Sequence, residues 1–160
     1  MSKAYNRVEW NFLEKHTEKL GFYEKWVSLI NMCIRSVSFS VLVNGEPHGL
    51  FQPNSGLRKG DPLSPYLFLL HAEGLHSLIQ QVENNGLIRG VSLCKDGPKV
   101  SHLFFVDDSL LFCQANDHDS QAMLEILEKY EHVSGQQINR DKTQIFFSAL
   151  THQDQCKNTS

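Results

Sequence analysis

The sequence has no long apolar run and no surplus of positive charge. None of its hydrophobic stretches reaches the ~20 residues that a transmembrane helix needs, and its start, MSKAYNRVEW, lacks the apolar core of a signal peptide. The formal net charge is -3, from 15 Lys and Arg against 18 Asp and Glu, so composition alone argues mildly against a nucleic-acid partner. These absences predict an intracellular protein, cytoplasmic or nuclear, without a membrane partner.

Cysteine and histidine pairs at metal-binding spacing are also missing. The four cysteines, at positions 33, 94, 113 and 156, lie far apart and form no CxxC pair. In an intracellular chain this favours free thiols over a zinc site or a disulfide partner. His71 and His76 share one predicted helix, but their separation of five is not the i, i+4 spacing of paired metal ligands. We therefore expect both to be core or rim residues.

The sequence does contain a globular mixture of helix and strand patterns. Its 160 residues, 41% of them apolar, suffice for a compact core. Apolar spacing predicts helices over 7–20 and 22–34, a third from Ser64-Pro65 to near Asn85-Gly86, and a fourth over 117–133 that Gly135 ends. Strands are predicted on either side of the turn Asn44-Gly45 and over 87–93, 99–106, 109–114 and 143–148. Interleaved helices and antiparallel hairpins predict an α+β fold, with one domain over 1–150 and a disordered polar tail over 151–160.

Two adjacent acidic residues interrupt an apolar hairpin. Asp107 and Asp108 stand between LFFV and SLLF, two runs without polar alternation, which predicts strands covered on both faces. Carboxylates beside such packing are poorly hydrated and repel each other, and a divalent cation with oxygen ligands would relieve both costs. The simpler alternative is a tight turn, where aspartate is common.

A second candidate site lies in the loop 51–65, FQPNSGLRKGDPLSP. Three prolines and two glycines predict a loop, and Ser64-Pro65 predicts that a helix begins at its end. Backbone N–H groups at a helix start can meet an anion, Arg58 and Lys59 add positive charge, and Gly60 lets another backbone approach. The alternative is a helix-capping loop with two solvated cations.

Together these motifs resemble the palm of reverse transcriptases, in particular those of plant LINE-type (non-LTR) retrotransposons. The resemblance rests on SKAYNRVEWNFL, GLRKGDPLSPYLF, FVDD and GQQINRDKTQIFFS, which follow the family's order from residue 2 to about 148. It implies a polymerase palm, an antiparallel sheet packed on helices, with incomplete fingers and no thumb. It also implies RNA-directed DNA synthesis from an RNA template, a DNA primer and a dNTP by two-metal nucleotidyl transfer.

The resemblance also implies a metal site and a leaving-group site. Asp107 would bind the catalytic Mg²⁺, or Mn²⁺, with Asp108 as its less essential neighbour. Lys142 stands where the family places a lysine near the pyrophosphate leaving group. The alternative for Lys142 is an ordinary exposed lysine.

Substrate-binding roles are implied for four further residues. Tyr5 would pack under the sugar of the incoming nucleotide and exclude a ribose 2′-OH. Gly60, with Arg58 and Lys59 beside it, would shape the floor for template and nucleotide.

The sequence departs from the family at its start. The family carries a metal-binding aspartate two residues before the serine of SKAY, so this aspartate would stand at position zero, before Met1. We therefore expect an N-terminally truncated fragment that is inactive alone and has an open sheet edge through which copies could associate. Asn6 replaces a usual aspartate, and Lys59 a common glutamine. The alternatives are a non-catalytic palm remnant that binds nucleic acid and an unselected pseudogene product.

Overall fold

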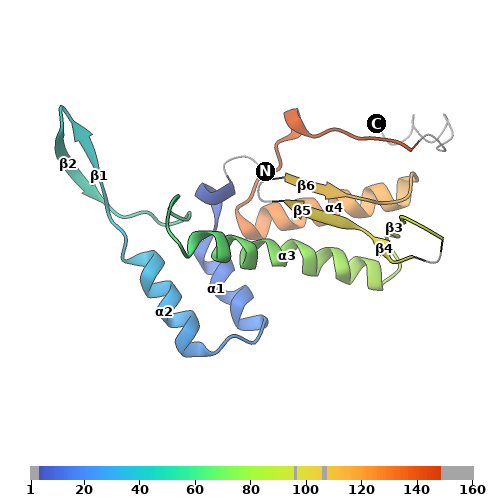
Figure 1. The fold of residues 1–160 in the computed structure, drawn as a ribbon, viewed down its shortest axis with the longest axis horizontal. Coiled ribbons are helices and arrows are strands. Elements are labelled where there is room, and N and C mark those ends of the chain that lie inside the picture. The colour runs from blue at the N-terminus through green and yellow to red at the C-terminus, as the bar shows by residue number, and fades with distance from the viewer. Residues whose placement is uncertain (1–3, 96, 106–107, 149–160) are drawn as a thin grey trace. The chain divides into compact units, whose positions relative to one another are not determined.

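The computed structural model describes residues 4–95, 97–105 and 108–148. Contacts divide the chain into two compact units, Tyr5–His71 on one hand and Met1–Ala4 with Ala72–Ser160 on the other. Four α-helices and short antiparallel strands alternate along the chain (Figure 1), which confirms the predicted α+β fold. A single palm domain over 1–150 stays a prediction, and the predicted tail 151–160 lies outside the described residues.

The unit Tyr5–His71 begins with two amphipathic helices. A short 3-10 helix, η1 (Ala4–Arg7), leads into α1 (Trp10–Lys19), and α2 (Glu24–Arg35) follows. Apolar residues at helical spacing face the interior, as the sequence pattern predicted. The buried apolar residues of α1 and α2 are Trp10, Leu13, Val27 and Ile30.

A two-stranded hairpin follows these helices. Strands β1 (Phe39–Val43) and β2 (Glu46–Phe51) pair antiparallel around Asn44 and Gly45 (Figure 1). Both turn residues have positive φ, 52° and 87°, as an Asn-Gly pair predicts for a tight hairpin turn. Every residue of the two strands is exposed.

The long helix α3 (Ser64–Asn84) begins at the predicted serine. Pro65 occupies the first turn, where a missing N–H costs nothing, and Gly86, with a φ of 72°, follows the end of the helix. The sequence of α3 is rich in apolar residues, and one side of the helix is deeply buried. The buried residues of α3 include Leu67, Phe68, His71, Leu75 and Ile79.

The remaining unit combines short hairpins with one further helix. Helix α4 (Asp117–Ser134) starts at Asn116, whose side chain accepts a hydrogen bond from Asp119 N–H, and ends at Gly135, which has a φ of 75°. Leu124 is 55% exposed, and the buried side of the helix includes Ile126. The other elements are β3 (Val91–Ser92), β4 (Lys99–Val100), β5 (His102–Phe105), β6 (Asp108–Leu111) and a 3-10 helix, η2 (Arg140–Lys142).

The described strands form short antiparallel sheets, the hairpins β1–β2, β3–β4 and β5–β6, which are consistent with a palm fragment. One strand prediction is wrong. Residues 143–148 form no strand, and Ile145 and Phe146 are 61% and 84% exposed. Alternating or branched side chains favour extended backbone, but they do not specify a pairing partner.

Two further features of the chain are its cysteines and the apolar character of its helices. The thiols of Cys33, Cys94 and Cys113 are free, and Cys156 lies outside the described residues. Within the described part of the chain, no helix combines the length and the apolar character needed to cross a bilayer.

Candidate active site

The β5–β6 hairpin places Asp108 at its tip. Asp108 is the first residue of β6, pairs with Phe105 of β5, and is exposed. Asp107, for which the main metal-binding role was predicted, lies outside the described residues. Among the described residues, no three His, Cys, Asp or Glu side chains gather as a metal site. The described donor at the tip is therefore one carboxylate, which suits a hard cation such as Mg²⁺ that keeps several waters and substrate oxygens.

The hairpin is packed on one face only. Leu103, Phe105 and Leu110 are 54%, 78% and 59% exposed, whereas His102 and Phe104 are half-buried. The prediction that both faces are covered is therefore wrong. The apolar runs resembled an inner strand of a sheet, but no other strand of the described residues pairs with the hairpin, and one of its faces is open.

In the unit Tyr5–His71, the first motif is hydrogen-bonded to the loop of the second. Leu57 N–H donates to the Tyr5 carbonyl at 2.8 Å, and Gly56 N–H donates to the Val8 carbonyl at 2.8 Å. The Tyr5 ring stacks on Phe68 of α3, with centroids 4.8 Å apart. The backbone of the predicted sugar-binding residue is thus joined to the segment that leads into Arg58.

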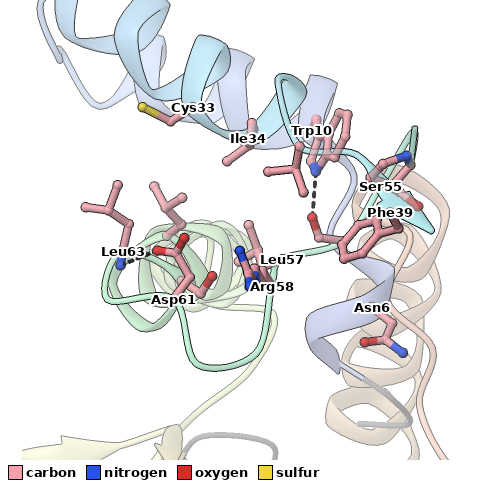
Figure 2. Close-up of a pocket in the computed structure, with 15 residues that line it drawn as sticks. Asn6, Trp10, Cys33, Ile34, Phe39, Ser55, Leu57, Arg58, Asp61 and Leu63 are labelled. Atoms are coloured by element: carbon pink, nitrogen blue, oxygen red, sulfur yellow. Dashed lines mark hydrogen bonds between the residues drawn. The ribbon is translucent and has the colours of Figure 1, made fainter. Parts of the chain in front are cut away.

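Gly56 makes this close approach possible. A Cβ at Gly56 would lie 3.0 Å from the Asn6 carbonyl oxygen, and its φ is +88°. Trp10 Nε1–H donates to the Gly56 carbonyl at 2.7 Å, so the same residue is held from the side of α1 (Figure 2). The sequence predicted Gly56 only as a loop residue. Its place two positions before Arg58 was the sequence feature that could have indicated a close backbone contact here.

Arg58 lines a mostly apolar pocket in the same unit. The pocket has a volume of about 220 Å³. Figure 2 shows Ile34 and Trp10 on one side of it and Leu57, Arg58 and Asp61 on the loop side. It is a small hollow beside a cationic loop.

Lys59 and Gly60 follow Arg58 on the exposed side of the loop. A Cβ at Gly60 would meet nothing within 4 Å, so its φ of +84° and not a neighbour within the chain favours glycine. Asp61 then organises the start of α3. Its carboxylate accepts from Leu63 N–H at 2.8 Å, and its carbonyl accepts from Ser64 N–H at 3.2 Å. Some N–H groups predicted to meet an anion are therefore bound within the loop.

Lys142 ends the 3-10 helix η2 and is exposed. Its backbone N–H donates to the Asn139 carbonyl at 3.1 Å. The neighbouring Arg140 lies 3.7 Å from Glu131 of α4. Among the described residues, no hydrogen bond or ion pair joins Lys142 to Asp108. Of the predicted site residues, the structure brings together Tyr5 and the loop that carries Arg58.

Comparisons with known proteins agree with the motifs. The family model described as reverse transcriptase (RNA-dependent DNA polymerase) matches residues 1–159. The chain is also similar to an uncharacterized mitochondrial protein of Arabidopsis thaliana, with 44% identity over 68 residues. That match covers 42% of this chain and 56% of the relative, so the chain spans little more than half of the relative's length. Because the family model covers nearly the whole sequence, the chain belongs to the reverse transcriptase family.

Proposed function

We propose that this chain is a palm fragment of an RNA-directed DNA polymerase from a non-LTR, LINE-type retrotransposon. The observation that carries the proposal is the direct bonding of two motifs. The Tyr5 carbonyl accepts from Leu57 N–H at 2.8 Å, so SKAY and GLRKGDPLSP, which are distant in the sequence, form one local structure. These two motifs, with FVDD and GQQIN behind them, all lie within residues 1–159, which the family model matches.

Asp107 and Asp108 would hold the divalent cation, Mg²⁺ or Mn²⁺. Asp108 offers an exposed carboxylate at a hairpin tip, where water and substrate oxygens can complete the coordination. When bound, divalent ions in such sites activate the attacking hydroxyl and stabilise the leaving oxygen.

The other predicted residues would bind and orient the substrates. Tyr5 presents a ring fixed by its stack on Phe68, a flat support for the sugar of a dNTP. Arg58 and Lys59 form no ion pair among the described residues, so their charges are free for phosphates of the template and primer. Lys142, exposed on η2, would neutralise the pyrophosphate leaving group.

We further propose that these 160 residues do not extend a primer on their own. The aspartate that the family carries in its first motif has no counterpart among them, and a two-metal site needs carboxylates from more than one segment. A non-catalytic role in binding nucleic acid is the second candidate, and the unpaired cations of the 58–59 loop favour it.

The test uses a fluorescent RNA template annealed to a DNA primer. Binding is measured by anisotropy between 50 and 200 mM salt, for the wild type, for R58A/K59A, and for K19A/K25A as a control with the same charge loss on exposed residues of the same unit. We expect R58A/K59A to weaken binding about tenfold and to reduce the salt slope by about one to two. Equal weakening by both variants contradicts the assigned site.

Primer extension with Mg²⁺ tests the catalytic part. We expect no incorporation by the 160-residue chain, and incorporation after a segment with the first-motif aspartate is added before Ser2. Asp107→Asn then abolishes this gain, whereas Asp117→Asn, at the start of α4, leaves it intact. Clear incorporation by the 160 residues alone contradicts the proposed inactivity.

A further inference from the structure

Two histidines outside the candidate active site face each other nitrogen to nitrogen. His76 Nδ1 of α3 lies 2.7 Å from His102 Nε2 of β5, and the ring centroids are 4.9 Å apart. Both side chains are half-buried. Such a short contact requires a shared proton, because two bare nitrogens or two N–H groups would repel each other.

The pair lies within a chain of polar groups that ends in a carboxylate on each side. His102 Nδ1 is 3.0 Å from Ser101 Oγ, and the buried Ser101 hydroxyl donates to Glu83 Oε2 at 3.0 Å. On the other side, His76 Nε2 lies 3.7 Å from Glu73 Oε1. The order is thus Glu73, His76, His102, Ser101, Glu83.

These contacts fix where protons can be held. Because the Ser101 hydroxyl donates to Glu83, Ser101 Oγ accepts from His102 Nδ1–H. His102 Nε2 then has no proton when the ring is neutral and accepts from His76 Nδ1–H. One further proton fits on His76 Nε2, which faces Glu73. A second one would put N–H groups on both facing nitrogens, so the contact admits at most one positive charge.

The surroundings favour this singly charged or neutral state. The pKa of His102 is lowered from its ordinary value of 6.5, first by burial and then by the nearby His76, whereas Glu83 and Glu73 act in the opposite direction. On the paired strand, the residue opposite His102 is the apolar Leu111. Among the described residues, the charged groups that act on His102 therefore belong to α3.

The contact between His76 and His102 attaches the β5–β6 hairpin to α3, because His102 is part of β5. His102 pairs with Leu111 at the open end of β5–β6, and Phe105 pairs with Asp108 at the tip. At about 3.4 Å per residue, the two ends lie about 10 Å apart. We propose that His76 and His102 are positioning residues that form a proton-dependent clamp, which holds the β5–β6 hairpin, with Asp108 at the start of β6, against α3. The effect on metal binding rests on the proposed function; the clamp itself does not.

The first experiment follows the imidazole ¹⁵N signals of the 160-residue chain between pH 4.5 and 8.5. We expect the His102 ring to titrate below the ordinary range of histidine, because burial and the nearby His76 lower its pKa. In His76→Gln, His102 titrates at a higher pH, and the control His48→Gln, on exposed β2, leaves the His102 ring unchanged. A wild-type His102 ring that titrates at its ordinary pH overturns the clamp, whether or not a variant folds.

The second experiment measures hydrogen exchange of the β5–β6 amides at pH 7.5 and 5.0, corrected for intrinsic exchange. We expect acid to speed exchange of the wild-type hairpin about tenfold relative to α4, the equivalent of one pKa unit of coupling. His76→Phe keeps a ring against His102 without a proton and loses this difference. An equal response of both proteins contradicts the clamp.

Mn²⁺ binding at the two pH values separates this inference from the proposed function. Weaker binding at pH 5.0 in the wild type, but not in His76→Phe, supports both. A clamp that titrates as expected in a chain that binds no Mn²⁺ supports the clamp and contradicts the metal role of the hairpin tip.

Discussion

Gln136 donates its side-chain Nε2–H to the Ala4 carbonyl at 2.9 Å, across a separation of 132 residues. Both residues are buried, with exposures of 1% and 0%. Gln136 N–H donates in turn to Ser134 Oγ at 3.2 Å, at the end of α4. The GQQIN motif is therefore anchored to the SKAY motif by a side chain that the sequence did not single out.

Loss of this anchor should destabilise the chain. Gln136→Leu leaves the buried Ala4 carbonyl without its donor, which costs about 1–3 kcal/mol of unfolding free energy. The adjacent Gln137 is exposed, so Gln137→Leu is a matched control with a change within about 0.5 kcal/mol. Urea unfolding followed by circular dichroism measures both, and equal effects would contradict a specific role for Gln136.

A side chain at Gly56 should separate the first two motifs. In Gly56→Ala the new Cβ would lie 3.0 Å from the Asn6 carbonyl oxygen, at a φ of +88°. Gly21 has nearly the same φ, +86°, but open space around it. We expect Gly21→Ala to cost about 1–2 kcal/mol from backbone strain alone and Gly56→Ala about 1–3 kcal/mol more, because the two backbones must move apart. Thermal unfolding of the two variants gives the comparison, and equal losses would exclude the close contact.

Acid should destabilise the chain through His102. Because the pKa of His102 is lowered in the folded state, the unfolded chain binds the proton more readily. The contribution of His102 to the free energy of unfolding is fully present above the ordinary histidine pKa of about 6.5. This contribution is lost as the pH falls from there through the lowered pKa of the folded state. Urea midpoints at pH 7.5, 6.5 and 5.5 should therefore fall more steeply for the wild type than for His102→Gln. Parallel profiles would contradict this assignment.

The cysteines should differ in reactivity. The pKa of the Cys113 thiol is raised, mainly by burial and also by Asp119, so little thiolate forms near pH 8. Cys33 and Cys94 are exposed. Limited treatment with iodoacetamide at pH 8, read by peptide mass spectrometry, should modify Cys33 and Cys94 well before Cys113. Modification of all three at one rate is the contrary result.

The β1–β2 hairpin should drive self-association. Leu42 and Leu50 are 70% and 78% exposed on a pair of strands that no third strand of the described residues joins. Such a hairpin is prone to pairing with another copy. We expect the wild type to associate with rising concentration, and L42K/L50K to require at least about tenfold more protein. Sedimentation velocity measures this, with L93K on the other unit as the control. A monomeric wild type at high concentration refutes the prediction.

Local signals explain what the sequence predicted well. Asn44-Gly45 specifies a tight turn, Ser64-Pro65 a helix start, and Gly135 a helix end, because each acts through the conformation of a few neighbouring residues. The family motifs are fixed local patterns too, and the roles that they suggest for Tyr5 and Arg58 stay predictions.

Non-local relationships were harder to foresee. Nothing in the sequence around His102 or Gln136 indicates which distant residue it contacts, and the polar His102 within an apolar strand was the one available hint. The predicted strand over 143–148 failed for a related reason. Branched and aromatic side chains there favour extended backbone, but a strand also needs a pairing partner, which local sequence does not specify.

The distribution of aromatic residues makes the two units optically distinguishable. Both tryptophans of the chain, Trp10 and Trp26, lie in the unit Tyr5–His71, and Trp10 is bonded through Nε1 to the Gly56 carbonyl. The indole emission of the chain therefore reports on that unit alone, whereas the far-UV amide signal is the sum over the helices of both units. One sample, heated once and observed in both channels, resolves whether the two halves melt together or in succession.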